Sequence, residues 1–335
     1  MIKAGLLLGL LAAALGYLSG AACGEQSELR VATQYGFGFL PMAVMRDRKL
    51  LEAEVARAGL PDTKVVWATF GGGNVMNEAL LSGGLDIATG GITPFITLWS
   101  KTRGTLNVKS LGALDTLPLW LMTRNPAVAS LADLRPSDKI AVTAVKVSVH
   151  AILLQMAAEK MWGIADYTRF DPLTVSLPQP DGMAALLSGA GEVDGHFTAP
   201  PFQYLEAKAP GIHRVTTAEE ILGGPATFVV AWATERFRAD NPKLYAAFRA
   251  ALDRSIAAIK ADPKGAAEIY RGGAKGVEAE TDYAEMLSDP SVDFTTTPSG
   301  TMRYLGFMQR IASVKAGAES WKDLFFPELH DQPGS

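Results

Sequence analysis

The sequence contains one cysteine, Cys23, and four histidines among its 335 residues. A single cysteine forms no internal disulfide and cannot belong to a metal-binding group of cysteines. The histidines lack the spacing of metal ligands such as HExxH; they are His150, His196, His213 and His330. The GxSxG elbow and the P-loop are also missing, and Gly36-Phe-Gly38 lacks the third glycine of GxGxxG. We therefore predict no metal, no cofactor and no enzymatic activity.

An excess of basic residues is also missing. Lysine and arginine number 31 and aspartate and glutamate 35, so the formal net charge is −4. Nucleic acids and anionic membranes call for a basic surface, which excludes both as expected partners. The 48% hydrophobic and 20% charged residues are typical of a globular protein with a sizeable core. The length exceeds one typical domain of roughly 100–200 residues, so we expect two lobes.

Residues 1–22 have the pattern of a secretory signal peptide. Lys3 is followed by an uncharged, mostly apolar run over residues 4–18 and by small residues up to Ala22. The run is shorter than the ~20 apolar residues that a membrane-spanning helix needs. We therefore predict an exported, periplasmic protein. Cys23 follows directly, and it is either a lipid-bearing first residue or an ordinary residue near the cleavage site. The first alternative is weakened by Gly20, where a lipoprotein signal resembles Leu.

A segment of the chain occurs twice. Residues 76–95 return in similar form as residues 183–202, each with an apolar helix end, a glycine break, a strand led by aspartate and a Thr/Pro/Phe loop. The spacing is far longer than the roughly 20–50 residues of solenoid repeats. We interpret the repeat as one copy in each of two lobes, with the strand ends of the two copies facing each other across a cleft.

Strand-type and helix-type segments alternate along the chain, which predicts an α/β fold with parallel or mixed sheets flanked by helices. Strands are expected at 29–33, 64–69, 85–89, 119–123, 139–144, 172–177, 212–216 and 227–233. Helices are expected at 41–58, 75–82, 151–161, 244–261, 266–270, 283–287 and 302–314, with the second repeat helix near 183. We assign residues 27–114 and 226–330 to a first lobe and residues 115–225 to an inserted second lobe. Two crossings between the lobes would form a hinge that closes around a ligand.

The signal peptide, the Gly/aromatic loop after the first strand and the paired Leu-Leu-Ser-Gly…Asp…Pro-Phe motifs together resemble a known group of proteins. This group is the substrate-binding proteins of bacterial ABC importers of the nitrate/sulfonate/taurine class, which includes binders of thiamine pyrimidine precursors. The resemblance extends from Leu29 to about Phe326 and is strongest over Val193–Phe202. It implies a two-lobed, type II-like periplasmic-binding-protein fold, a ligand in the cleft and delivery to a permease in the inner membrane.

Ligands of parallel α/β sheets bind beyond the carboxyl ends of strands, so the loops after strands hold the candidate residues. In the first lobe they are Gln34, Tyr35, Gly36, Phe37, Gly72, Gly73, Asn74, Gly91, Ile92 and Thr93. Rings beside polar groups suit a small-molecule pocket. The glycines precede helices, whose free backbone N–H groups bind sulfonates and carboxylates. A core position for Phe37 and a plain turn at Gly72 are the alternatives.

In the second lobe, the repeat places His196 and Thr198 in the opposing wall. The loop before the first helix of that lobe adds Lys146, Ser148 and His150, with Ser148 as a helix N-cap. Aromatic Trp120 and, where the chain re-enters the first lobe, Thr227 complete the candidates.

None of these loops contains arginine, the residue best suited to clamp a carboxylate. The ligand's acid is therefore held by backbone N–H groups and hydroxyls, or the ligand is not strongly anionic. We predict a monomeric binding protein for a small sulfonate, carboxylate or similar compound, with an apolar or aromatic part. An exported sensory or enzymatic relative is the alternative.

Overall fold

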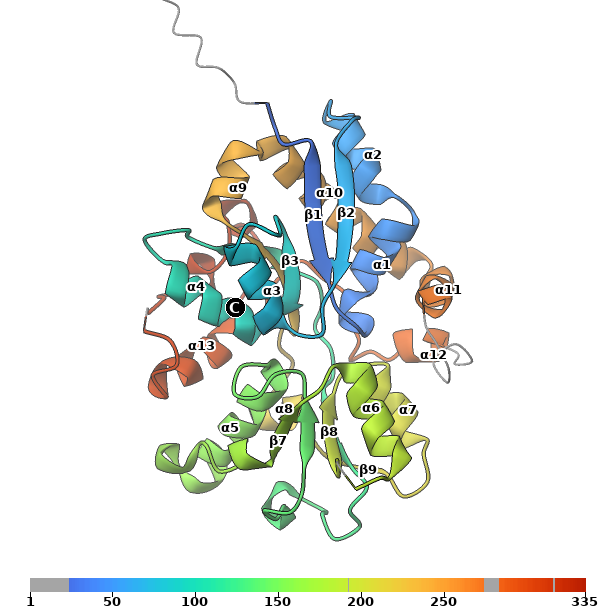
Figure 1. The fold of residues 1–335 in the computed structure, drawn as a ribbon, viewed down its shortest axis with the longest axis vertical. Helices are drawn as coiled ribbons and strands as arrows, with labels where there is room; N and C mark the ends of the chain where they lie inside the picture. The colour runs from blue at the N-terminus through green and yellow to red at the C-terminus, as the bar shows by residue number, and fades with distance from the viewer. Residues whose placement is uncertain (1–23, 192, 274–282, 316) are drawn as a thin grey trace, which may run out of the picture.

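The computed structural model describes residues 24–191, 193–273, 283–315 and 317–335, which form two lobes stacked along the long axis (Figure 1). The predicted signal peptide and Cys23 lie outside the described residues. No helix of the described part is both long and apolar enough to cross a bilayer.

The first lobe contains two small sheets. β1 (Glu28–Thr33) and β2 (Lys64–Thr69) pair in parallel, with Leu29 opposite Val65. β10 (Val229–Ala233) lies between β3 (Ala88–Gly91) and β4 (Lys109–Ala113) and is antiparallel to both. The sequence predicted one parallel βαβαβ sheet here and missed β4. Instead, β3 pairs with β10, and Val31↔Ile87 is an isolated parallel bridge toward β1.

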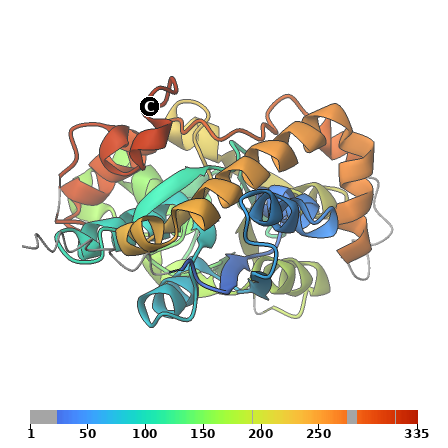
Figure 2. The same cartoon turned by 90° about the horizontal axis from the view of Figure 1, so that it is seen from above.

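Nine helices of the described first lobe surround these sheets (Figures 1 and 2). They are α1 (Leu40–Asp47), α2 (Leu50–Arg57), α3 (Gly73–Leu81), α4 (Ile92–Thr102), α9 (Glu235–Asp240), α10 (Pro242–Ala261), α11 (Pro263–Gly273), α12 (Tyr283–Leu287) and α13 (Thr301–Arg310). The sequence predicted a single helix over 41–58. Lys49 instead has φ 50° and separates α1 from α2, because a left-handed residue interrupts the helical hydrogen bonds. The long helix α10 packs along both.

The second lobe is built on one five-stranded sheet with the order β7-β6-β8-β5-β9. Its strands are β5 (Trp120–Thr123), β6 (Ile140–Val142), β7 (Thr174–Ser176), β8 (Gly195–Thr198) and β9 (His213–Thr217). β6 is parallel to β7 and β8, whereas β5 is antiparallel to β8 and β9. The helices of this lobe are α5 (Val149–Trp162), α6 (Gln179–Ser188), α7 (Phe202–Ala207) and α8 (Ala218–Leu222).

The aspartate of the repeat has the same structural role in both lobes. Asp86 accepts a hydrogen bond from the backbone N of Arg30 (2.7 Å), and Asp194 accepts one from the backbone N of Lys139 (2.9 Å). In return, the backbone N of Asp86 donates to the carbonyl of Arg30, and the backbone N of Asp194 donates to the carbonyl of Lys139. The repeated aspartates therefore fix a neighbouring strand in each lobe and do not face the cleft.

The chain crosses between the lobes twice, and the two crossing segments lie side by side. Thr116 and Thr227 form an antiparallel bridge, and Asp115, fully buried, accepts a hydrogen bond from the backbone N of Val229 (3.2 Å). Burial raises the pKa of Asp115 well above its ordinary value. The Thr227 hydroxyl accepts from the backbone N of Ser299 (2.9 Å). Thr227 thus belongs to the hinge and is buried there.

Candidate functional site

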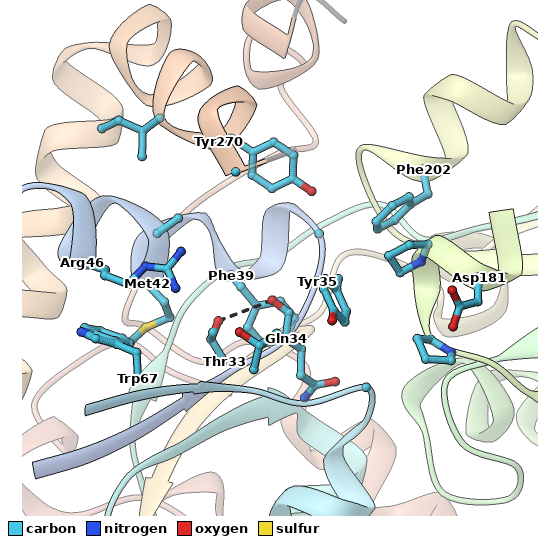
Figure 3. Close-up of a pocket in the computed structure, with 18 residues that line it drawn as sticks. Thr33, Gln34, Tyr35, Phe39, Met42, Arg46, Trp67, Asp181, Phe202 and Tyr270 are labelled. Atoms are coloured by element: carbon cyan, nitrogen blue, oxygen red, sulfur yellow. Dashed lines mark hydrogen bonds between the residues drawn. The ribbon is translucent and has the colours of Figure 1, made fainter. Parts of the chain in front are cut away.

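A cavity of about 580 Å³ lies between the lobes, beyond the ends of β1 and β2 (Figure 3). Five aromatic side chains line it: Tyr35, Phe39, Trp67, Phe202 and Tyr270. Thr33, Gln34 and Thr69 add polar groups, and Arg46 and Asp181 add charges of opposite sign. Phe202, Asp181 and two prolines belong to the second lobe, so both lobes form the wall.

The loop after β1 is placed against the second lobe through Gly36. This glycine has φ 102°, and a Cβ on it would lie 3.2 Å from the Pro200 carbonyl oxygen. The next residue, Phe37, donates its backbone N–H to the same oxygen (2.8 Å). A left-handed glycine therefore permits the close approach of the two backbones. Tyr35 is left 46% exposed at the cavity, and Gln34 donates from Nε2 to the Thr89 carbonyl (3.2 Å).

A second, smaller cavity of about 20 Å³ adjoins the same loop. Its wall includes the first residues of three helices: Gly73 of α3, Gly91 before α4, and Ser148 and Val149 at the start of α5. Ser148 acts as the predicted N-cap, because its hydroxyl accepts from the backbone N of Ala151 (3.3 Å). A cavity of this volume has room for about one water molecule.

His150 forms part of this smaller cavity as a neutral ring. Burial lowers the pKa of His150 to about 3, and the nearby His196 contributes a smaller part of this shift. Its Nε2 lies 3.4 Å from Nε2 of Gln179, whose Oε1 accepts a hydrogen bond from the Thr198 hydroxyl. Nδ1 of His150 has no hydrogen-bond partner among the described residues. Thr198 is thus connected to the cavity through Gln179.

His196 lies inside the second lobe, away from both cavities. Its Nδ1 is 2.6 Å from Oε1 of Glu206, and both side chains are fully buried. Burial raises the pKa of Glu206, which the neighbouring His196 partly offsets. Gly182 of α6 covers the other edge of the ring, since a Cβ there would lie 2.6 Å from His196 Nε2.

The remaining predicted residues of the first lobe divide between core and surface. Phe37 is buried against the rings of Tyr270 (4.9 Å) and Tyr283 (5.4 Å), in the alternative core position. Ile92 is also in the core. Gly72 caps α3, while Asn74 is exposed. None of these four lines either cavity.

Three other predicted residues, one in the first lobe and two in the second, line neither cavity. The Thr93 hydroxyl donates to the Val147 carbonyl (2.7 Å), which joins the two lobes. Trp120 packs against Tyr204, with ring centroids 4.9 Å apart, and lies under the guanidinium of Arg214. Lys146 is exposed, with φ 63°.

Sequence reasoning missed Arg46, Trp67, Tyr270, Gln179 and Asp181. Arg46 and Tyr270 project from helices α1 and α11, and Trp67 lies within β2, so none of the three follows the end of a strand, where the sequence placed its candidates. The loops after strands contain no arginine, but Arg46 of helix α1 brings a guanidinium group to the larger cavity. Gln179 and Asp181 lie at the start of α6, before the repeated segment of residues 183–202, and directly follow the expected strand at 172–177. Their position after a strand was therefore the signal that could have found them.

The sequence matches no protein-family model and no curated protein. Solved structures do match over most of the chain. The alkanesulfonate-binding protein SsuA from Xanthomonas axonopodis pv. citri, bound to MOPS, is 18% identical with a TM-score of 0.64, over 88% of this chain and 96% of that chain. The aliphatic sulphonate-binding protein SsuA from Escherichia coli is 18% identical with a TM-score of 0.63, over 92% and 100%. A ligand-binding component of an ABC-type import system from Staphylococcus aureus is 15% identical with a TM-score of 0.63, over 91% and 98%.

These similarities establish the fold. The chain has the two-lobed α/β fold of periplasmic binding proteins, with a hinge of two crossings, as the sequence predicted. In the described residues, no group of three or more His, Cys, Asp and Glu is arranged to hold a metal ion.

Proposed function

We propose that this protein is the extracytoplasmic solute-binding component of an ABC importer, which captures a small organic ligand between its lobes and delivers it to a permease. The observation that carries the proposal is the cavity of about 580 Å³, lined from both lobes of a periplasmic-binding-protein fold. Its volume lies within the roughly 300–1,000 Å³ of small-molecule pockets. Binding without chemical turnover is proposed, as is action as a monomer.

The chemistry of the wall supports a ligand with an acidic group and an apolar part. Tyr35, Trp67 and Phe202 offer ring faces, which bury apolar surface in well-defined orientations. Gln34, Thr33 and Thr69 offer hydrogen-bonding groups beside them. A pocket with mostly apolar walls and a few polar groups selects its ligand through those groups. Sulfonates and carboxylates are therefore the first classes to test, followed by pyrimidines.

Contacts between the lobes support closure around such a ligand. Besides the bonds at Phe37 and Thr93, the Tyr204 hydroxyl of the second lobe donates to Asp289 of the first (2.6 Å). Each of these contacts forms only when the lobes are close together. A ligand that touches both walls therefore shifts the equilibrium between open and closed lobes further toward the closed arrangement.

A thermal-shift and calorimetric screen of sulfonates, carboxylates and pyrimidines against the mature protein tests this proposal. Ala43 lines the cavity from α1, so Ala43→Phe should fill part of it and weaken binding at least tenfold. Ala56→Phe, on the exposed side of α2, is the matched control and should bind as the original protein does. Absence of binding by the folded protein across the library would remove the proposal's main support. Conversion of a bound compound, detected by mass spectrometry, would replace it with an enzymatic function.

A further inference from the structure

Two side chains of opposite charge line the larger cavity. Among the described lining residues, only Arg46 and Asp181 are charged. Arg46 projects from α1 of the first lobe, and Asp181 lies in the first turn of α6 in the second lobe. Figure 3 shows them on opposite sides of the labelled side chains, with Arg46 beside Trp67 and Met42 and Asp181 on the side of Phe202. The cavity is therefore positive on one side and negative on the other.

Both charges are available to a ligand. In the described part of the chain, neither side chain forms an ion pair, and neither has a side-chain hydrogen bond. Neighbouring Arg48, by contrast, is paired with Asp262 (3.7 Å). A free guanidinium presents a planar fork of donors that matches a carboxylate or sulfonate. A carboxylate such as Asp181 accepts hydrogen bonds from an ammonium group.

The space between these two charges suits an apolar or aromatic group. In Figure 3 the rings of Tyr35 and Phe39 lie between the two charged side chains, and the ring of Trp67 lies beside Arg46. Such rings bury apolar surface and orient a planar partner.

The smaller cavity cannot compete for the acidic group as the lobes now lie. The starts of α3, α4 and α5 would favour an anion, but about 20 Å³ admits only about one water molecule. A sulfonate or carboxylate has several heavy atoms and does not fit. In the larger cavity, Arg46 is the single cationic group among the described lining residues. The acid of the ligand is therefore placed at Arg46.

We infer that the ligand is an elongated zwitterion, with its acidic group at Arg46, its ammonium group at Asp181 and an apolar or aromatic middle between them. This inference rests on the proposed function and names its substrate class. The ligand connects the lobes through charge, since each lobe supplies one of the two charged partners. A compound with only one charge forms a charge-assisted hydrogen bond at only one of these two side chains, so it should bind less tightly than the zwitterion.

A set of compounds that share one ring tests this directly. The zwitterions are 4-(aminomethyl)benzoate and its longer analogue 4′-(aminomethyl)biphenyl-4-carboxylate. The singly charged partners are 4-methylbenzoate with 4-methylbenzylamine, and the corresponding biphenyls. Calorimetry on the mature chain should show at least one zwitterion binding about tenfold or more tightly than both of its singly charged analogues.

Two variants assign the ends of the ligand. Arg46→Gln should abolish the preference for the zwitterion over the amine, and Asp181→Asn should abolish its preference over the acid. Arg48→Gln and Asp62→Asn, away from the cavity, should leave both preferences intact. Melting curves of all four variants check that they fold.

The inference is overturned if the singly charged compounds bind as tightly as the zwitterions, if neither zwitterion binds at millimolar concentration, or if both variants leave the preferences unchanged. The proposed function remains supported after such results if any other compound of the screen binds and Ala43→Phe weakens the binding of that compound. It fails separately when no compound of the wider screen binds.

Discussion

At the scale of single residues, His150 is the clearest case of a side chain whose surroundings fix its charge. It is 1% exposed, and burial lowers its pKa to about 3, against about 6.5 in an unfolded chain. Between these values the unfolded chain binds a proton that the folded chain does not. The free energy of unfolding therefore rises with pH across this window and levels off above about pH 6.5.

Replacing His150 removes this pH dependence. Between pH 7 and pH 4, we expect the free energy of unfolding of the original protein to fall on the order of 3 kcal/mol further than that of the His150→Gln variant. Urea unfolding at several pH values measures the difference, in which the titration of other groups cancels. Asn74→Gln, at an exposed position without a titratable group, serves as the control and should parallel the original. Parallel curves for His150→Gln would contradict the burial argument.

At the scale of elements, helix α6 lies against β8 through a glycine. A Cβ on Gly182 would lie 2.6 Å from His196 Nε2, inside a fully buried pair with Glu206. Helix propensity alone favours alanine by about 1 kcal/mol. We expect the clash to cost more, because His196 is fully buried and a shift of its ring would disturb the contact with Glu206.

We therefore expect Gly182→Ala to lower the free energy of unfolding by about 1–3 kcal/mol. Gly306 of α13 is the matched control, since the nearest atom to a Cβ there is the end of Arg310 at 3.8 Å. Gly306→Ala should stabilise the protein by about 0.5–1 kcal/mol. Denaturant titration measures the free energy of unfolding of both variants. If both substitutions stabilise the protein, α6 can shift away from β8 and the packing argument is wrong.

The elements also show how far the sequence could predict the fold. The strands β1, β2 and β10 were located because they are short runs rich in apolar and β-branched residues, and the helices α5 and α10 because they are long segments without an internal glycine or proline. Strand β4 was missed, because Lys109–Ala113 includes a serine and a glycine and reads as a turn. Its partner β10 is more than a hundred residues away, and no local signal reports such pairing.

The candidate site could be predicted in part, for a related reason. Of the candidates in loops after strands, Gln34, Tyr35 and Gly36 line the larger cavity, and Gly73, Gly91, Ser148 and His150 line the smaller. Side chains from helix faces depend on how α1 and α11 pack against the sheets. That packing is a tertiary property, so Arg46 and Tyr270 carried no local signal.

At the scale of the whole molecule, an ion pair outside the cavities also connects the lobes. Arg310 of α13 donates from Nε and Nη2 to the two carboxylate oxygens of Glu159 in α5 (2.8 and 2.7 Å). The side chains are 54% and 19% exposed, so the pair contributes about 0–1 kcal/mol. A contribution of this size still shifts the balance between open and closed lobes.

We expect Arg310→Gln to raise the Kd of any cleft ligand by up to about fivefold, mainly through faster release. Arg236→Gln breaks an exposed pair with Asp240 inside the first lobe and should leave the Kd unchanged. Stopped-flow release rates at low and high salt measure both, and the difference should shrink as salt screens the pair. Equal effects of the two substitutions would show that the Arg310–Glu159 pair does not hold the lobes together.

The central claim is that a small ligand is bound between the lobes, and tryptophan fluorescence tests it most directly. Of the six tryptophans, Trp67 alone lines either of the two cavities between the lobes in the described part of the chain, whereas Trp120 packs on Tyr204 in the second lobe. A compound selected by the screen should change the emission of the original protein and of Trp120→Phe. The account predicts that Trp67→Phe loses most of this change. A signal that persists in Trp67→Phe and disappears in Trp120→Phe would place the ligand elsewhere and contradict the account.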